Sequence, residues 1–211
     1  MKILRKLSAA VGAAVVLSSA PAFANLIVNG GFEASNSSTV TPTGWTNVGH
    51  SDGVVTYALF GTPAYEGVNF YDLGGFGNSN GPSGDGIQQA VATIAGTAYQ
   101  LNFGLSSENQ SGTEVLAVCF NGLSCTSYTL GLDGSGILLK PFATQTINFV
   151  ATNALTTISF IATTGGGFND PMIDNVIFDT VRGNAVPEPA SLALLGLGLA
   201  GLGFSRRKQA A

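Results

Sequence analysis

The sequence predicts an all-β fold, an antiparallel β-sandwich, over its central part. The clearest observation is alternation along 99–105, where Tyr99, Leu101, Phe103 and Leu105 share one face and polar residues or glycine share the other. A period of two residues with one polar face is typical of antiparallel strands that cover a core on one side. Clusters of Gly, Asn and Ser separate such segments, and no stretch of the central part shows helical periodicity.

About eight to ten short strands are expected, at the spacing typical of a sandwich. The segments with the clearest patterns are Val54–Phe60, Gly86–Ala92, Tyr99–Leu105, Glu114–Phe120, Ser124–Leu130, Thr146–Phe149, Thr157–Phe160 and Met172–Thr180. Gly74–Gly86 and Thr163–Asp170 are expected to be loops. The first of these is rich in glycine but has no Lys or Arg, so it does not match a phosphate-binding loop.

Charge is distributed unevenly along the chain. The 211 residues carry a formal charge of −4, and only 9% of them are charged. Residues 25–186 hold eleven acidic residues against Lys140 and Arg182, which gives this part a formal charge of −9. Such a balance repels phosphate backbones, so no nucleic-acid partner is expected.

The first 24 residues have the pattern of a secretory signal peptide. In order, they contain a positive start (Lys2, Arg5 and Lys6), an apolar run over 7–20 and the A-x-A site Ala22-Phe23-Ala24. The apolar run is shorter than the roughly 20 residues that a membrane helix needs. Signal peptidase is therefore expected to cut after Ala24 and leave Asn25 as the mature start. A retained membrane anchor is the alternative.

Residues 184–211 form a second segment of unusual composition. Pro187-Glu188-Pro189 is followed by an apolar run over 190–204 and by Arg206-Arg207-Lys208. As a helix, the run would span roughly 22 Å at 1.5 Å per residue, short of a bilayer core of about 30 Å. The basic cluster should stay on the cytoplasmic side. We expect a hydrophobic helix that halts the chain transiently in the inner membrane.

This segment resembles the PEP-CTERM sorting signal of Gram-negative bacteria, because Pro187-Glu188-Pro189, the Gly/Leu/Ala-rich run and Arg206-Arg207-Lys208 follow one another in order. The resemblance implies recognition by an exosortase and a cut near Pro187–Pro189. Proteins with this signal are often surface proteins or associated with exopolysaccharide. A plain C-terminal membrane anchor is the alternative. Either way, the central domain would lie outside the cytoplasm. After exosortase processing, its expected destination is the outer surface or the extracellular matrix.

The two cysteines, Cys119 and Cys125, flank a hairpin signal at Asn121-Gly122. A three-residue loop over 121–123 would place Cys119 opposite Cys125, within bonding range. A two-residue loop over 121–122 would place Cys119 opposite Ser124 and make the bridge diagonal. Because exported proteins meet an oxidising compartment, we expect a Cys119–Cys125 disulfide.

Catalytic chemistry is not expected. The single histidine, His50, stands in Val48-Gly-His-Ser-Asp52, and adjacent residues do not converge as a catalytic triad does. No G-x-S-x-G motif occurs in the sequence. A polysaccharide-active enzyme would need only two carboxylates at a set separation, and this alternative stays open.

Four motifs in order give the central domain a second resemblance. They are Asn25-Leu-Ile-Val-Asn-Gly-Gly-Phe-Glu33 with Thr43-Gly-Trp45, Gly86-Ile-Gln-Gln-Ala-Val91, Gly96-Thr-Ala-Tyr-Gln-Leu-Asn-Phe103 and Met172-Ile-Asp-Asn-Val-Ile-Phe178. Residues 25–183 thus resemble the galactose-binding-like domains of many carbohydrate-binding modules. The resemblance implies a jelly-roll β-sandwich and suggests association with extracellular polysaccharide. A purely structural matrix protein without a glycan ligand is the alternative.

The same resemblance implies a structural Ca²⁺ held by Glu33 and Asp174. If Val176 and Phe178 face the core, a strict period of two places Asp174 on the same face, where a carboxylate needs a partner. A calcium ion is one such partner; backbone N–H groups at the strand end are the other. Asn175 stands where many relatives have a second Asp.

The ligand-binding residues cannot be named from the sequence. Aromatic platforms are the expected means of holding a sugar ring. Trp45 is expected in the core rather than at the surface, and Tyr99 is expected to point inward. The remaining candidates are Tyr57, Tyr65, Tyr71 and Tyr128.

Overall fold

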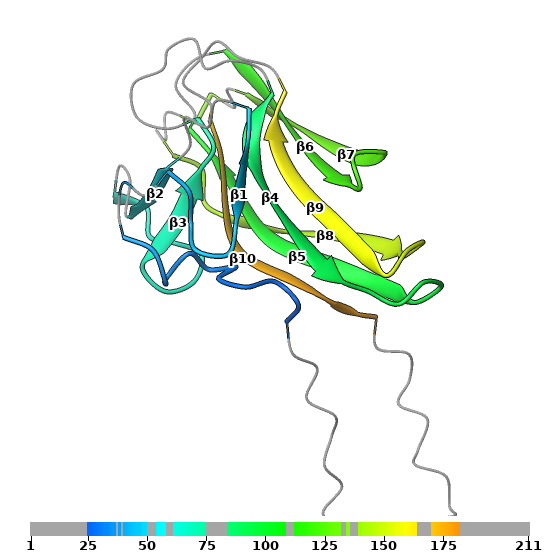
Figure 1. Ribbon diagram of the computed structural model, residues 1–211. Helices are drawn as coiled ribbons and strands as arrows, with labels where there is room; N and C mark the ends of the chain where they lie inside the picture. The colour runs from blue at the N-terminus through cyan, green and yellow to red at the C-terminus, as the bar shows by residue number, and fades with distance from the viewer. Residues whose placement is uncertain are drawn as a thin grey trace, which may run out of the picture.

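A computed structural model of the chain describes residues 25–36, 38, 40–49, 54–57, 61–74, 84–108, 112–131, 134–135, 139–163 and 170–181. Over these residues the chain forms two five-stranded antiparallel sheets that pack face to face (Figure 1). The predicted all-β sandwich is confirmed. The signal-peptide segment 1–24, the tail from 182 onward and His50 lie outside the described residues.

The first sheet, named sheet A, has the strand order β1-β4-β9-β6-β7. Its strands are β1 (Thr46–Val48), β4 (Asp85–Ala92), β9 (Leu155–Ala162), β6 (Thr113–Phe120) and β7 (Ser124–Gly131). Sheet B has the order β2-β3-β10-β5-β8. Its strands are β2 (Val54–Tyr57), β3 (Asn69–Asp72), β10 (Pro171–Thr180), β5 (Ala98–Ser107) and β8 (Ala143–Val150).

Two strands, β1 and β3, were not among the predicted segments, and β2 is shorter than predicted. Strand β3 lacks alternation because both of its faces are covered. Tyr71 packs in the main core, whereas Phe70 packs with Leu139 and Met172 in a second small cluster. Strand β1 has only three residues, too few to show a period.

The main core lies between the sheets. On β5 the alternating side chains of Tyr99, Leu101 and Phe103 are buried as predicted. Phe160 of sheet A meets Phe103 edge-on, with ring centroids 5.1 Å apart. Trp45 is buried and its Nε1 donates to the backbone oxygen of Asn29 at 3.1 Å, so it belongs to the core, as predicted.

A β-bulge in β10 corrects the prediction for Asp174. Asp174 pairs with Gly104, Ile177 pairs with Asn102, and the register shifts between them. Asn175 adopts a left-handed conformation with φ of 47°. Because the bulge adds a residue, Asp174 faces away from the core that holds Val176, and the strict period of two was wrong here. Asp174 is nevertheless buried.

The start of the described chain runs along its last strand. Asn25 Nδ2 donates to the backbone oxygen of Val176 at 3.0 Å, and the backbone N–H of Leu26 donates to Phe178 at 3.0 Å. The two ends of the described chain therefore lie at the same end of the sandwich (Figure 1). None of the described residues forms a helix with the length and apolar character needed to cross a bilayer.

Candidate functional site

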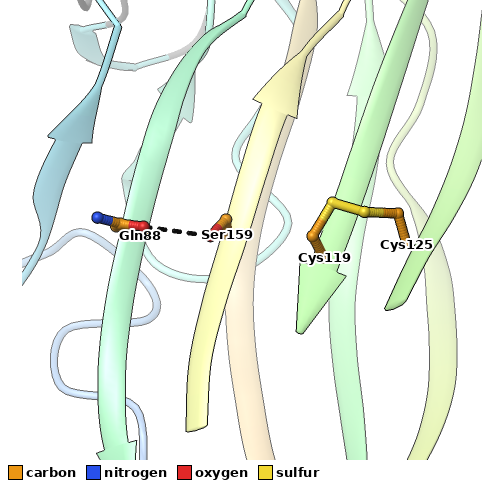
Figure 2. The surroundings of a disulfide bond; sticks show 4 residues. All are labelled: Gln88, Cys119, Cys125 and Ser159. Carbon is orange, nitrogen blue, oxygen red and sulfur yellow. Dashed lines mark hydrogen bonds between the residues drawn. A yellow bond between two sulfur atoms is a disulfide. The ribbon is translucent and has the colours of Figure 1, made fainter. Parts of the chain in front are cut away.

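The outer face of sheet A is neutral and carries the disulfide. Cys119 and Cys125 face each other across β6 and β7, and their Sγ atoms are 2.04 Å apart. The pairing of Phe120 with Ser124 shows that the hairpin has the three-residue loop over 121–123. Beside the disulfide, Ser159 Oγ donates to Gln88 Oε1 at 3.3 Å (Figure 2).

The outer face of sheet B carries a continuous row of hydrogen-bonded polar side chains. Gln100 pairs with Asn148, and Asn102 with Thr146, across β5 and β8. The row consists of Thr146 Oγ1 donating to Asn102 Oδ1 at 2.7 Å, Asn102 Nδ2 to Gln100 Oε1 at 3.1 Å, and Gln100 Nε2 to Asn148 Oδ1 at 3.1 Å. We name these four side chains the amide strip. They occupy outward positions because their neighbours on β5 point into the core.

An aromatic ring lies beside the amide strip. Tyr65 is 39% exposed, and its hydroxyl hydrogen-bonds the hydroxyl of Thr144 on β8. Its ring lies over Gly104, where an added Cβ would be 2.7 Å from Tyr65 Cγ. Gly104 thus leaves room for the ring to lie directly on the sheet.

The other aromatic candidates are less suited to hold a sugar. Tyr71 is fully buried and its hydroxyl donates to the backbone oxygen of Val40 at 2.9 Å. Tyr128 packs against the core, where its ring meets Phe103 edge-on. The side chain of Tyr57 lies outside the described residues. Of the four tyrosines predicted as platforms, Tyr65 is the one that the structure places on an outer face among described side chains.

The two predicted calcium ligands lie near one another. An added Cβ on Gly31 would be 3.9 Å from Asp174 Oδ1, from Glu33 Cγ and from Glu66 Oε2. Burial raises the pKa of Asp174 to about 7, the backbone N–H groups of Glu66, Asn175 and Tyr65 lower it, and the charge of Glu33 raises it. Three carboxyl groups therefore surround the N-terminal turn.

Backbone N–H groups already donate hydrogen bonds to the carboxylate oxygens of Asp174 and Glu33. Asp174 Oδ2 accepts from Glu66 N at 2.9 Å, and Oδ1 accepts from Asn175 N at 2.6 Å. Glu33 Oε1 accepts from Val68 N and Asn69 N, both at 2.7 Å. Among the described residues, no three His, Cys, Asp or Glu side chains form a group able to hold a metal. An ion between Glu33 and Asp174 would therefore need further oxygen ligands.

A cluster of buried acidic residues lies at the end of the sandwich opposite the chain ends. It contains Asp72, Asp85, Glu108, Glu114 and Asp170, which stand at the ends or starts of β3 to β6 and β10. Glu114 and Asp170 share a side-chain hydrogen bond. Burial raises the pKa of Glu114 to about 7, and burial together with the charges of Asp72, Glu114 and Glu108 raises the pKa of Asp170 to about 8. We name these five residues the acidic end.

Neither the amide strip nor the acidic end was predicted from the sequence. Two of the strip's four residues could be predicted to point outward, because Gln100 and Asn102 are the polar residues of the strand with the clearest alternation. Its pairing with Thr146 and Asn148 depends on the register between β5 and β8, which the pattern does not give. The acidic end joins residues from five strands, and no sequence spacing signals such a cluster.

Comparison with known proteins matches the tail to a family model. Residues 185–208 match the PEP-CTERM protein-sorting motif. They include Pro187, Glu188 and Pro189 and the basic cluster Arg206-Arg207-Lys208, all outside the described residues. No curated protein matches the sequence.

Solved structures match the domain. TmCBM61 in complex with β-1,4-galactotriose aligns at a TM-score of 0.51 and 18% identity, covering 75% of this chain and 99% of that one. The K1 cleaved adhesin domain of Lys-gingipain from Porphyromonas gingivalis W83 aligns at 0.51 and 13%, covering 73% and 96%. A family 16 carbohydrate-binding module aligns at 0.46 and 20%, covering 75% and 100%. The chain thus carries a PEP-CTERM protein-sorting motif behind a jelly-roll domain with the fold of carbohydrate-binding modules.

Proposed function

We propose that the domain binds a neutral extracellular polysaccharide at the amide strip and Tyr65. The observation that carries this proposal is the row of four polar side chains beside an exposed ring on one sheet face. Amide groups both donate and accept, so each can hold a sugar hydroxyl. The face of a tyrosine ring can pack on the apolar side of a sugar ring.

The charge of the domain favours a neutral ligand. Lys140 is the one lysine or arginine between 25 and 181, and its Nζ donates to the backbone oxygen of Gly131. The strip itself contains no cation, and Asp179 of β10 pairs with Gln100 at its edge. A polyanionic polysaccharide would find no compensating charge there, whereas hydroxyl groups need none.

A catalytic role is the competing proposal, and the geometry of the buried carboxyls weighs against it. Glu114 and Asp170 hydrogen-bond each other, whereas the carboxyls of glycosidases stand about 5 to 9.5 Å apart on either side of the sugar. A purely structural role without a glycan ligand is the third class. All three proposed roles (glycan binding, catalysis and structure) require the same route: export, signal-peptidase cleavage after Ala24 and exosortase processing of the tail.

Binding is tested with the full chain on an array of neutral and acidic oligosaccharides that includes β-1,4-galactotriose, together with a reducing-sugar release assay. We expect neutral glycans to bind without release. In Gln100→Ala/Asn148→Ala the affinity should fall roughly thirtyfold, at about 1 kcal/mol for each of the two hydrogen-bonding groups. Tyr65→Ala should lower it similarly.

Gln88→Ala is the matched control, because Gln88 is an amide on the outer face of the other sheet. Its affinity should equal that of the unchanged protein. An empty array would contradict the proposal in favour of a structural role, and sugar release would favour the enzyme. Equal losses in Gln88→Ala and Gln100→Ala/Asn148→Ala would place the glycan elsewhere.

We further propose that Ca²⁺ bridges Glu33 and Asp174. Support comes from the burial of Asp174 near two other carboxyls, because a buried carboxylate gains from a nearby cation. The ion would tie the N-terminal turn to β10. Calcium should raise the Tm, a chelator should reverse the rise, and Glu33→Gln should abolish it. Asp179→Asn, on the outer face of β10, should leave it intact; a Tm indifferent to calcium would exclude the ion.

The proposed destination is the outer surface or extracellular matrix of a Gram-negative bacterium, after transient anchoring in the inner membrane. The sorting motif at 185–208 supports this route. Intact mass of the exported protein tests both cuts: one after Ala24 and one near Pro187–Pro189. A mass that retains the tail would contradict exosortase cleavage.

A further inference from the structure

Exposed apolar side chains gather at the end of the sandwich where the described chain ends. Ile94 in the β4–β5 turn is 69% exposed, Val150 and Leu155 at the β8–β9 turn are each 57% exposed, and Val181 after β10 is 40% exposed. We name these four side chains the apolar end. Isolated apolar side chains are normal on protein surfaces. Whether these four form a contact surface therefore depends on how close together they lie and on the charge around them.

Backbone hydrogen bonds hold the apolar end together. The bonds that join its segments are Thr93 N to Ala154 O at 3.0 Å, Gly96 N to Ala151 O at 2.7 Å, Ala151 N to Thr97 O at 3.0 Å and Val181 N to Ala98 O at 2.9 Å. In addition, Ala92 pairs with Leu155 and Ala98 with Val150. The two turns and the exit of the chain therefore lie side by side at this end of the sandwich. Val150 borders it on the outer face of sheet B and Leu155 on the outer face of sheet A.

Two of the three segments of this surface are also uncharged, whereas Val181 in the third stands between Asp179 and Arg182 in the sequence. Neither 92–98 nor 150–155 contains a charged residue. The neighbouring β6–β7 turn adds Asn121, Gly122 and Leu123, of which Leu123 is 91% exposed. The five carboxyls of the acidic end lie at the far ends of the strands. The domain is thus polarised along its length.

The tail limits how far this surface can be from a membrane. Eight residues, 182–189, separate Val181 from the apolar run over 190–204. Fully extended, they reach roughly 27 Å at about 3.4 Å per residue. Whenever the run is in the bilayer, the tether keeps the apolar end near the lipid at a high effective concentration.

We propose that the apolar end rests on the lipid bilayer while the tail is in the membrane, with Ile94, Val150, Leu155 and Val181 in the headgroup region. Each side chain gains from leaving water. The acidic end then points away from anionic headgroups, which repel carboxylates. The proposal depends on the tail being in the membrane but not on glycan binding. Val150 follows Asn148 on the outward face of β8, so the strip begins next to the proposed contact and extends away from it along the strand.

The test uses the full chain, reconstituted through its own tail into vesicles of phosphatidylethanolamine and phosphatidylglycerol. Both native cysteines are in the disulfide, so Ile94→Cys accepts a single nitroxide label. We expect this label to be accessible to oxygen dissolved in lipid and shielded from a water-soluble nickel complex. Thr113→Cys, exposed at the start of β6 at the opposite end, should show the reverse.

Equal accessibility of the two labels to the nickel complex would overturn the proposal. Shielding of the Ile94→Cys label from both reagents would also overturn it, because this would indicate cover by the tail or another protein. As a second measurement, a label on Val150→Cys should return to water in Ile94→Asp/Leu155→Asp. Val68→Asp, a change of an equally exposed apolar residue before β3, should have no such effect.

Discussion

The two ends of the sandwich are built from opposite chemistry. Beneath the apolar end, aromatic rings fill the core: Tyr99 stacks on Phe178 with centroids 5.0 Å apart, and Phe120 stacks on Phe149 at 4.2 Å. At the acidic end, carboxyl groups are buried near one another, and Gly74 is so close to Asp170 that an added Cβ would be 2.0 Å from its Cγ.

The difference means that the two ends contribute unequally to the stability of the domain. Ring packing stabilises the end from which the tail emerges. Buried carboxyls must either keep a proton or be ionised at a cost. A domain that carries such a cluster at one end therefore depends on the other end and the central core for much of its stability. The following four predictions test this division.

The largest effect is expected from removing a ring under the apolar end. Phe178 is fully buried between Tyr99 and Phe120. Phe178→Ala should lower the free energy of unfolding by about 3–5 kcal/mol, because it leaves a cavity where the sheets meet. Chemical denaturation measures the change. A loss no greater than that of a surface substitution would show that this end is not where the stability resides.

The next effect concerns the acidic end and depends on pH. In the folded chain the pKa of Glu114 is raised to about 7 and that of Asp170 to about 8. The folded state therefore binds more protons than the unfolded state between about pH 4 and pH 8, and stability should fall as the pH rises through this window. Above it, Glu114→Gln should raise the free energy of unfolding by an amount on the order of 2 kcal/mol.

Thermal unfolding over this pH range, with a chelator present, measures the slope. Glu114→Gln should flatten the decline, whereas Asp179→Asn, a half-exposed carboxyl on β10 outside the cluster, should leave it as it is. A stability that rises with pH over the window would mean that the carboxyls are compensated in the folded protein.

The disulfide is expected to contribute a comparable or smaller amount. It closes a short loop between residues six apart. Replacing both cysteines, Cys119→Ala/Cys125→Ala, should cost on the order of 2 kcal/mol through the entropy of the unfolded chain. The same variant should bind glycans normally, because the bridge is on the face of sheet A. Loss of binding would mean that this face, and not the amide strip, holds the ligand.

The smallest effect is expected at the surface of the apolar end. Ile94→Ser should change the free energy of unfolding by less than about 0.5 kcal/mol, because the side chain is mostly exposed. Ile94→Ser should weaken the contact of the apolar end with lipid, which exists only when the tail is in a vesicle. A large loss of stability in solution would mean that Ile94 serves the fold itself.

The sequence predicted the sandwich because most strands cover the core on one side only. Along 99–105 the alternation predicted which side chains point inward. Its polar positions, Gln100 and Asn102, are members of the amide strip. Strand β3 escaped prediction because loops cover its outer face, which makes both faces apolar. Asp174 was assigned to the wrong face because a bulge changes the side-chain period, and a bulge leaves no clear mark in a single sequence.

The candidate site was harder to predict than the fold. Hydrogen bonds of the strip cross between β5 and β8, so they require the register of strands far apart in sequence. Tyr65 was one of four tyrosines named from the sequence, and only burial distinguishes it from Tyr71. The pairing of Glu33 with Asp174 could be predicted only from the family resemblance, because the two residues come from the N-terminal turn and from β10, far apart in sequence.

The place of β10 in sheet B has a consequence for the order of events during export. β10 is the central strand of its sheet, between β3 and β5, yet it is the last of the strands that the structure describes. Among the described residues, the last strand of sheet A ends at Ala162, so this sheet can pair without β10. If the chain crosses the inner membrane in extended form, sheet B cannot close until residue 180 has emerged. Only nine residues, 181–189, then remain before the apolar run, so folding would be completed as translocation halts.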